Sequence, residues 1–223
     1  MKYIHHHLGL GDHIINNGMV RHFCKEYGAI SLFAYNHNLK NVEYMYRDID
    51  RVKIIGVESD MEADEYVSKN NLDCMKIIRS SQKCDLPFDK AFYKLAGLDF
   101  SVRFNEFYYE RDLEEEKRVL NTLNPDNERY VFIHDDPSRR FKINMDRIRT
   151  SYRVIMNDKR FNVFDYLTLI ERAEEIHFMQ SSFKELICSY KLMKPKLYQH
   201  NYVRNYGGYL NSSGLNEIQE IKS

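Results

Sequence analysis

Segments of two kinds alternate along this chain, and the alternation limits the possible folds more than any other feature. Short apolar runs of strand length are followed by longer segments with the apolar spacing of helices. The predicted strands cover residues 3–7, 30–35, 52–57, 73–78, 130–134, 152–155, 175–178 and 196–198. The predicted helices cover residues 12–27, 61–69, 88–96, 112–123, 163–173 and 182–190, and residues 41–48 form a short helix or turn. Strands joined by helices indicate an α/β fold with parallel sheets.

One break interrupts this alternation. The run Asn124-Pro125-Asp126-Asn127 consists of turn-forming residues. The sequence therefore predicts two Rossmann-like halves with parallel sheets facing a cleft, residues 1–124 and 125–223. From about residue 200 the chain is rich in Asn, Tyr, Gly and Ser, which predicts an irregular tail on the second half.

Charge and composition exclude several classes of protein. The 33 basic and 33 acidic residues give a net charge of +0, which argues against bulk binding to nucleic acid or to an anionic membrane. The four cysteines lack CxxC spacing, so we expect free thiols in a reducing compartment. There is no apolar signal region and no stretch of about 20 apolar residues. We expect a cytoplasmic protein without a membrane span, and the sequence is compatible with a homodimer.

The first motif with chemical potential is Gly9-Leu10-Gly11-Asp12-His13. The glycines permit a tight turn between a strand and a helix, and the free backbone N–H groups of a helix start can bind an anion or a substrate. Asp12 beside histidines could act as a general base, with His13 positioning a substrate or tuning Asp12. The alternative is that Asp12 only caps the helix.

Two further motifs lie in the second half. The strand ending at His134 leads into a loop with the cations Arg139, Arg140 and Lys142, and arginine forks match phosphate oxygens. The alternative is a solvated loop with local Asp–Arg pairs. Near the end, a short strand leads through Gln180-Ser181-Ser182-Phe183 into a helix. The two serines could cap that helix, with Glu185 as the capping-box partner of Ser182, and could also hold a phosphate.

The histidines His5, His6, His7 and His13 also raise the question of a metal. Zinc requires a third protein ligand in good geometry, and no such ligand is evident in the sequence. We therefore expect no metal site, and we interpret these histidines as hydrogen-bonding residues that line a cleft.

Together the three motifs resemble the GT-B glycosyltransferases, especially their heptosyltransferase-like and fucosyltransferase-like branches. In the first branch a Leu-Gly-Asp turn supplies the aspartate that activates the acceptor hydroxyl, and Leu10-Gly11-Asp12 matches it. In the second branch a His and a nearby Arg meet the donor diphosphate. His134 matches the first, and Arg139 or Arg140 would take the place of the second. A Ser-rich turn binds the donor phosphates there, and residues 180–183 match it.

The resemblance implies a metal-independent, inverting glycosyltransferase that needs no cofactor. It would transfer a sugar from a nucleotide-diphosphate sugar to the hydroxyl of a glycan or another acceptor. The implied catalytic residues are Asp12 and His13, and the implied donor-binding residues are Gly9, Gly11, His134, Arg139, Arg140, Lys142, Gln180, Ser181, Ser182 and Phe183. Asp136 stands where the family has its arginine, which favours the alternative of a non-catalytic nucleotide- or glycan-binding module, or a subunit of a larger assembly.

Overall fold

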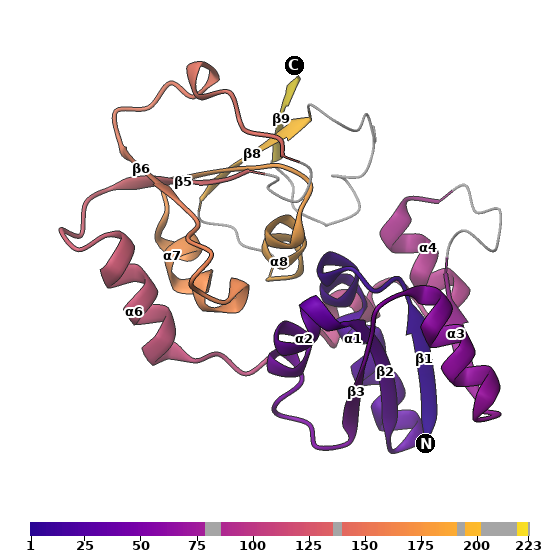
Figure 1. Cartoon of the computed structure of the whole chain (residues 1–223). Helices are drawn as coiled ribbons and strands as arrows, with labels where there is room; N and C mark the ends of the chain where they lie inside the picture. Colours follow the sequence, from indigo (N-terminus) through magenta and orange to yellow (C-terminus); the bar gives the residue numbers. More distant parts are fainter. Residues whose placement is uncertain (79–85, 136–139, 191–194, 202–217, 223) are drawn as a thin grey trace. The chain divides into compact units, whose positions relative to one another are not determined.

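The chain forms two compact units, Met1–Glu110 and Arg111–Ser223. The computed structural model describes residues 1–78, 86–135, 140–190, 195–201 and 218–222. Each unit contains one parallel sheet with helices packed against it (Figure 1). The predicted α/β class with two parallel sheets is therefore confirmed.

The sheet of the first unit has the strand order β3-β2-β1-β4. Its strands are β1 (Lys2–His6), β2 (Ile30–Tyr35), β3 (Val52–Val57) and β4 (Cys74–Ile77). All pairs are parallel, with Lys2 opposite Ile30 and Ile30 opposite Val52. β2 is central and is buried from Ile30 to Ala34, which explains why its sequence is almost continuously apolar rather than alternating.

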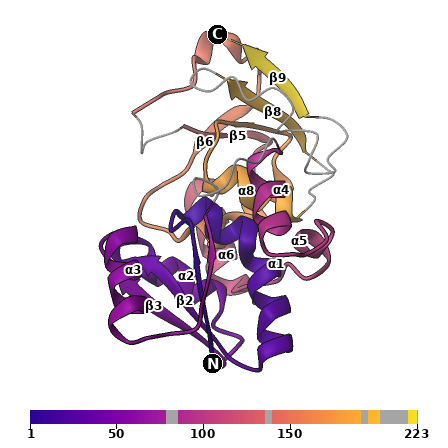
Figure 2. The same cartoon turned by 90° about the vertical axis from the view of Figure 1, so that its right-hand side faces the viewer.

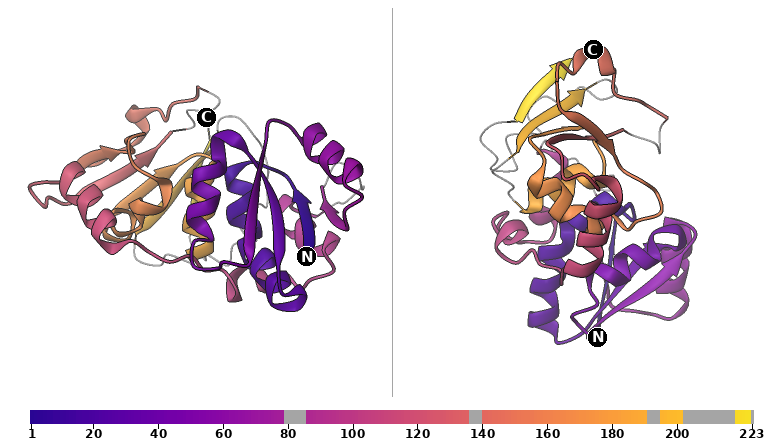
Figure 3. Two further views of the ribbon diagram at one scale, coloured as in Figure 1. Left: turned by 60° about the horizontal axis from the view of Figure 1, so that its bottom comes forward. Right: turned by 90° about the vertical axis from the view of Figure 1, so that its left-hand side faces the viewer.

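Helices cover both faces of this sheet (Figure 3). They are α1 (Leu10–Tyr27), α2 (Leu39–Met45) after the 3-10 turn η1 (Asn36–Asn38), α3 (Asp60–Lys69), α4 (Phe88–Leu95) and α5 (Val102–Asn105). α1 is buried over most of its surface, polar residues included, rather than along the predicted apolar stripe alone. The cause is that it packs against α5 and α4 as well as against the sheet.

The sheet of the second unit has the order β6-β5-β7-β8-β9. Its strands are β5 (Tyr130–His134), β6 (Arg153–Met156), β7 (Glu175–Phe178), β8 (Lys196–Asn201) and β9 (Ile218–Lys222). Its helical segments are α6 (Leu113–Leu123), η3 (Met145–Arg147), η4 (Val163–Tyr166), α7 (Leu167–Arg172) and α8 (Ser182–Tyr190). One sheet face packs on helices, where Phe132 contacts Tyr166 and Phe183. The other face packs on the loop after β5, where Ile143 covers Val131 and Ile133.

Three expectations differ from the structure of the second unit. The predicted irregular tail contains β9, which pairs in parallel with β8 over Leu197–Asn201 (Figure 2). Residues 202–217 lie outside the described residues. β9 was not predicted, because its sequence, Ile-Gln-Glu-Ile-Lys, lacks the apolar run that is typical of a buried strand. The predicted helix 163–173 is a 3-10 turn followed by the shorter helix α7, and the predicted strand 196–198 extends to Asn201.

The division between the units falls before α6, whereas the turn residues at 124–127 placed it after α6. Arg111 explains the difference, because its guanidinium bonds Glu116 of α6 and both Thr168 and Glu171 of α7. Glu116 is completely buried and also accepts hydrogen bonds from the Thr168 backbone and hydroxyl. α6 is thus attached to the second unit by a buried polar network.

Two expected features can be compared with the described residues directly. Cys24, Cys74 and Cys188 form no disulfide there, and Cys84 lies outside the described residues. None of the described helices combines the length and the apolar character needed to cross a bilayer.

Candidate functional site

The turn between β1 and α1 places Asp12 at the carboxyl edge of the first sheet, where ligands of open α/β sheets bind. Gly9 is the N-cap of α1, with extended backbone at φ −69° and ψ 146°, and Asp12 is the third helical residue. A Cβ on Gly9 would lie 2.7 Å from Oδ2 of Asp12. The carboxylate therefore folds back over the cap residue, into space that only glycine leaves open. The predicted strand-turn-helix is present, but β1 ends at His6 and α1 begins at Leu10, two residues before the predicted start, so Gly11 lies in the first turn of the helix rather than in the preceding turn.

His13 lies inside the first unit rather than on its surface. Its ring is fully buried and meets His6 edge-on, with the two ring centroids 4.6 Å apart. Neither of its ring nitrogens has a hydrogen-bond partner among the described residues. Burial holds the pKa of His13 well below its ordinary value, and the nearby His6 lowers it further. The ring is thus a neutral core group, and its predicted catalytic role stays a prediction.

A second polar group at the same edge was not singled out from the sequence. The Tyr35 hydroxyl donates to Oδ2 of Asp60 at 2.8 Å, and Nε2 of His5 lies 3.1 Å from Oδ1. Nδ1 of His5 lies 3.2 Å from Oδ1 of Asp64, which is also bound by Lys76. The sequence did contain one indication of this group. Tyr35 ends one predicted strand and Asp60 follows the next, and the carboxyl ends of parallel strands meet at the same edge of a sheet.

Electrostatics link this group to Asp12. The hydrogen bond to Asp60 raises the pKa of Tyr35 to about 12, together with burial and the negative charges of Asp60 and Asp12. Burial alone would raise the pKa of Asp60, but the hydrogen bonds from Tyr35 and His5 outweigh it and lower that pKa below its ordinary value. Asp60 therefore stays ionised at neutral pH, and Asp12 lies within the electrostatic range of Tyr35.

In the second unit, His134 and Phe183 come together at the carboxyl edge. His134 ends β5, and its ring lies over Phe183 of α8, with the two centroids 4.1 Å apart. Nδ1 of His134 bonds the side-chain oxygen of Asn157, just beyond β6, at 2.9 Å. Asn157 had no signal in the sequence, because its partner is 23 residues away. His134 is thus fixed from two neighbouring elements.

Of the two serines predicted to cap α8, Ser181 has the capping role. Ser182 is the first residue of α8, and the Ser181 hydroxyl accepts from the backbone N–H of Lys184 at 3.5 Å. Glu185, the expected capping-box partner of Ser182, accepts a hydrogen bond from Nζ of Lys184 at 3.1 Å. The N–H groups of a helix start favour anions. Gln180 precedes this turn and is partly buried.

The predicted cations stand on the loop after β5. Arg140 and Lys142 are exposed, and Asp135 fixes the base of the loop by accepting from the backbone N–H of Ile143 at 2.8 Å. Arg140 has φ 61°, in the left-handed region that non-glycine residues rarely adopt. Arg139 lies outside the described residues, as does Asp136.

The predicted site residues thus form two groups. Gly9, Gly11, Asp12 and His13 belong to the first unit, and His134, Ser181, Ser182 and Phe183 gather on neighbouring elements of the second. Their roles, and the cleft expected between the halves, stay predictions. Within the described ranges, no three His, Cys, Asp or Glu side chains are grouped so that they could hold a metal ion.

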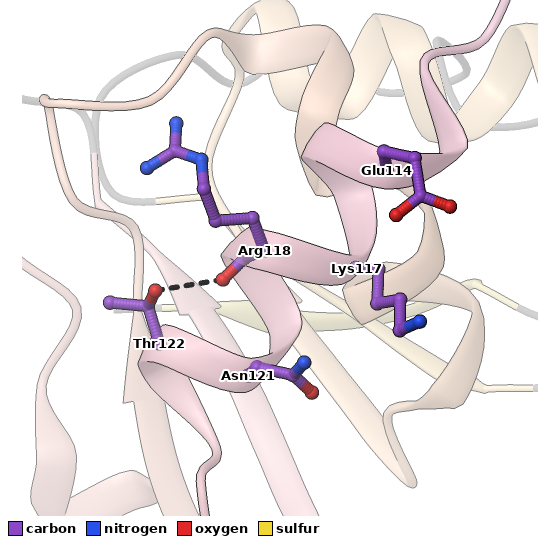
Figure 4. Close-up of a pocket in the computed structure, with 5 residues that line it drawn as sticks. All are labelled: Glu114, Lys117, Arg118, Asn121 and Thr122. Atoms are coloured by element: carbon purple, nitrogen blue, oxygen red, sulfur yellow. Dashed lines mark hydrogen bonds between the residues drawn. The ribbon is translucent and has the colours of Figure 1, made fainter.

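A surface hollow of about 360 Å³ lies along one side of α6 (Figure 4). It is lined by Glu114, Lys117, Arg118, Asn121 and Thr122. All five lie on the exposed side of α6, and the Thr122 hydroxyl is already bonded to the Arg118 carbonyl. We assign no chemistry to this hollow.

The folds of two solved proteins are similar to this one. A family 9 glycosyl transferase from Veillonella parvula DSM 2008 aligns with a TM-score of 0.60 and 8% identity, over 100% of this chain and 86% of that chain. The ADP-heptose LPS heptosyltransferase II of E. coli aligns with a TM-score of 0.52 and 8% identity, over 99% and 90%. The predicted resemblance to GT-B enzymes is therefore confirmed at the level of the fold. No protein-family model matches the chain, and no curated protein matches its sequence.

Proposed function

We propose that this protein is an inverting, metal-independent glycosyltransferase that uses a nucleotide-diphosphate sugar as donor. The observation that carries the proposal is the position of Asp12, whose carboxylate folds over a glycine cap at the carboxyl edge of the first sheet. The overall similarity to two glycosyltransferase folds supports the same activity class.

The reaction needs one base and one stabilised leaving group. Asp12 takes the proton of the acceptor hydroxyl while that oxygen forms a bond to the anomeric carbon of the donor sugar. The bond from that carbon to the phosphate oxygen breaks, and the nucleoside diphosphate leaves with the electron pair. A single displacement inverts the configuration of the anomeric carbon.

The second unit would bind the donor. The start of α8 offers backbone N–H groups to a phosphate, and Arg139, Arg140 and Lys142 supply positive charge for the diphosphate as its negative charge grows. The rings of His134 and Phe183 pack together at an interplanar angle of 35° beside that helix start. The name of the E. coli neighbour includes ADP-heptose, so we include ADP among the nucleotides to test.

The decisive experiment separates binding from turnover. Calorimetry with UDP, GDP and ADP identifies the nucleotide, and the corresponding nucleotide sugars are then assayed for transfer and for slow hydrolysis. We expect Asp12→Asn to bind the nucleotide normally and to lose roughly 10²–10⁴-fold in kcat, the usual effect of losing a general base. Arg140→Ala should weaken nucleotide binding instead.

Glu114→Gln is a matched control, because it also removes a carboxylate from the first turn of a helix and should leave turnover unchanged. Asp12→Asn turning over at the wild-type rate would remove Asp12 from the mechanism. Nucleotide binding without turnover of any nucleotide sugar would support the binding module instead. Undiminished transfer in EDTA and an inverted anomeric signal in the NMR spectrum of the product test the two finer parts of the proposal.

A further inference from the structure

We propose that Asp60 binds the acceptor by accepting a hydrogen bond from a hydroxyl next to the one that Asp12 deprotonates. The acceptor is then a polyol with vicinal hydroxyls, such as a sugar. This inference rests on the proposed function and adds a substrate class and a second carboxylate to it.

The first support is the state of the Asp60 carboxylate. Tyr35 donates to one of its oxygens and His5 contacts the other, at 2.8 and 3.1 Å. Its side chain nevertheless remains 45% exposed. Since an ionised carboxylate offers about four lone-pair sites, each oxygen can accept one more hydrogen bond from the solvent side. Asp60 is therefore both fixed in orientation and accessible.

The second support is its place in the fold. The carboxyl end of β2 lies between those of β1 and β3. Asp12 follows β1, Asp60 follows β3, and Tyr35 ends β2 between them. The Tyr35 hydroxyl donates a hydrogen bond to Asp60. The negative charge of Asp12 also contributes to the raised pKa of Tyr35. The two carboxylates thus flank one strand end at the same edge of the sheet.

The third support is the number of side chains that hold Asp60. The His5 side chain is only 1% exposed and lies between Asp60 and Asp64, with each ring nitrogen close to one carboxylate. A network of this kind presets the geometry of one exposed carboxylate, which lowers the cost of binding a ligand there.

A hydroxyl-rich acceptor fits this arrangement best. Asp12 and Asp60 are both acceptors of hydrogen bonds, so their ligand must supply two donors from neighbouring positions. Vicinal hydroxyls of a sugar supply them without bringing an unpaired charge. Tyr35 and His5 act as positioning residues, because they bond Asp60 and not the acceptor.

The test uses methyl glycosides of glucose, galactose and mannose as acceptors, with the nucleotide sugar that the wild-type protein turns over. We expect Asp60→Asn to raise the acceptor KM roughly tenfold or more, the usual effect of losing a hydrogen bond to a charged group, and to change kcat much less. Asp64→Asn is the matched comparison, because Asp64 contacts the same imidazole and is 46% exposed. It should raise the acceptor KM much less than Asp60→Asn does, because it leaves the Asp60 carboxylate and its hydrogen bond from Tyr35 in place.

A deoxy series shows whether the hydrogen bond exists. Removing from the acceptor the hydroxyl that Asp60 binds should abolish the difference in KM between the wild type and Asp60→Asn. Tyr35→Phe gives a smaller rise in KM, and it tests the proposal even when Asp60→Asn does not fold.

Equal effects of Asp60→Asn and Asp64→Asn would reduce Asp60 to a support for His5 and overturn the inference. So would a difference in KM that persists with every deoxy acceptor. Transfer or donor hydrolysis that no methyl glycoside accelerates would overturn the polyol assignment while leaving the proposed function intact. Absence of both nucleotide binding and donor turnover would end the proposed function itself, and this inference with it.

Discussion

At the scale of single residues, the position of Asp12 depends on the missing side chain of Gly9. The backbone of Gly9 is ordinary, at φ −69°, so alanine fits the backbone, but its Cβ would meet the Asp12 carboxylate. We expect Gly9→Ala to lower kcat of sugar transfer by about tenfold or more, because a misplaced catalytic group loses rate steeply. The thermal midpoint should change little.

Steady-state kinetics and a thermal melt of this variant are the measurements. Gly11→Ala, inside the same turn of α1, is the comparison that separates helix propensity from displacement of Asp12. Wild-type turnover by Gly9→Ala would show that the folded-back carboxylate is not the reactive geometry.

The buried pair His6 and His13 predicts a pH dependence of stability. Burial lowers the pKa of His6 to about 4 and that of His13 well below its ordinary value of 6.5. Between about pH 4 and 6.5 these two histidines are therefore protonated more fully in the unfolded chain than in the folded chain. Stability should be complete above about pH 6.5 and should fall as the pH drops towards 4.

Urea unfolding at several pH values measures this effect. His13→Leu should flatten the pH dependence, whereas His37→Ala, at an exposed position, should not. Because His177 and His200 are also depressed to about 4 by burial, part of the slope should remain. An unchanged slope in His13→Leu would contradict the assignment.

The residues that sequence alone could identify were those whose neighbours are close in the chain. The turn at Gly9 and Asp12 and the cap before α8 are local patterns, and both are present. Tyr35, Asp60 and His5 come from three elements. Their proximity depends on strand order, which residue types do not encode locally.

At the scale of elements, the contact of α1 with α5 depends on Gly18. A Cβ at Gly18 would collide with the Val102 carbonyl and lie 3.0 Å from that of Arg103. We expect Gly18→Ala to destabilise the protein by about 1–3 kcal/mol, as overpacking does, although alanine favours a helix by about 1 kcal/mol over glycine.

The free energy of unfolding in urea is the measurement, with Glu26→Ala at an exposed position of α1 as the control. A stabilised Gly18→Ala would mean that α5 can move away at no cost.

Elements with a continuous apolar run were predictable to the residue. β2, β3, β5 and β7 have the predicted bounds. The apolar signal is clearest in β2 and β5, which are buried along almost their whole length. α5 has only four residues, too few for a helical period to appear, and it is held by tertiary packing on α1. β9 is partly exposed at the edge of its sheet, so its polar residues carry no burial signal.

At the scale of the whole molecule, the attachment of α6 predicts which fragment folds. The unit Arg111–Ser223 includes α6, and Val119 and Leu120 of α6 are buried. We expect residues 111–223 to unfold cooperatively in urea with native-like circular dichroism. Residues 125–223 should unfold at clearly lower urea, because they lack Glu116 and the apolar face of α6.

Equal midpoints of the two fragments would show that α6 adds nothing to the second unit. The turn-forming residues at 124–127 could not reveal this attachment, because turn chemistry marks where a chain bends and not which side a helix joins. Arg111 and Glu171 are 60 residues apart in the sequence. The composition of the chain gives no indication that the two side chains are bonded.

Every strand pair in the described residues is parallel. Within a unit, the segments that follow the strands therefore all begin at one edge of the sheet, which we call the rim. The segments that lead into the next strand end at the opposite edge. A lineage with this framework can acquire a new specificity by rewriting a few rim segments, and the mutations that do so need not disturb the interior.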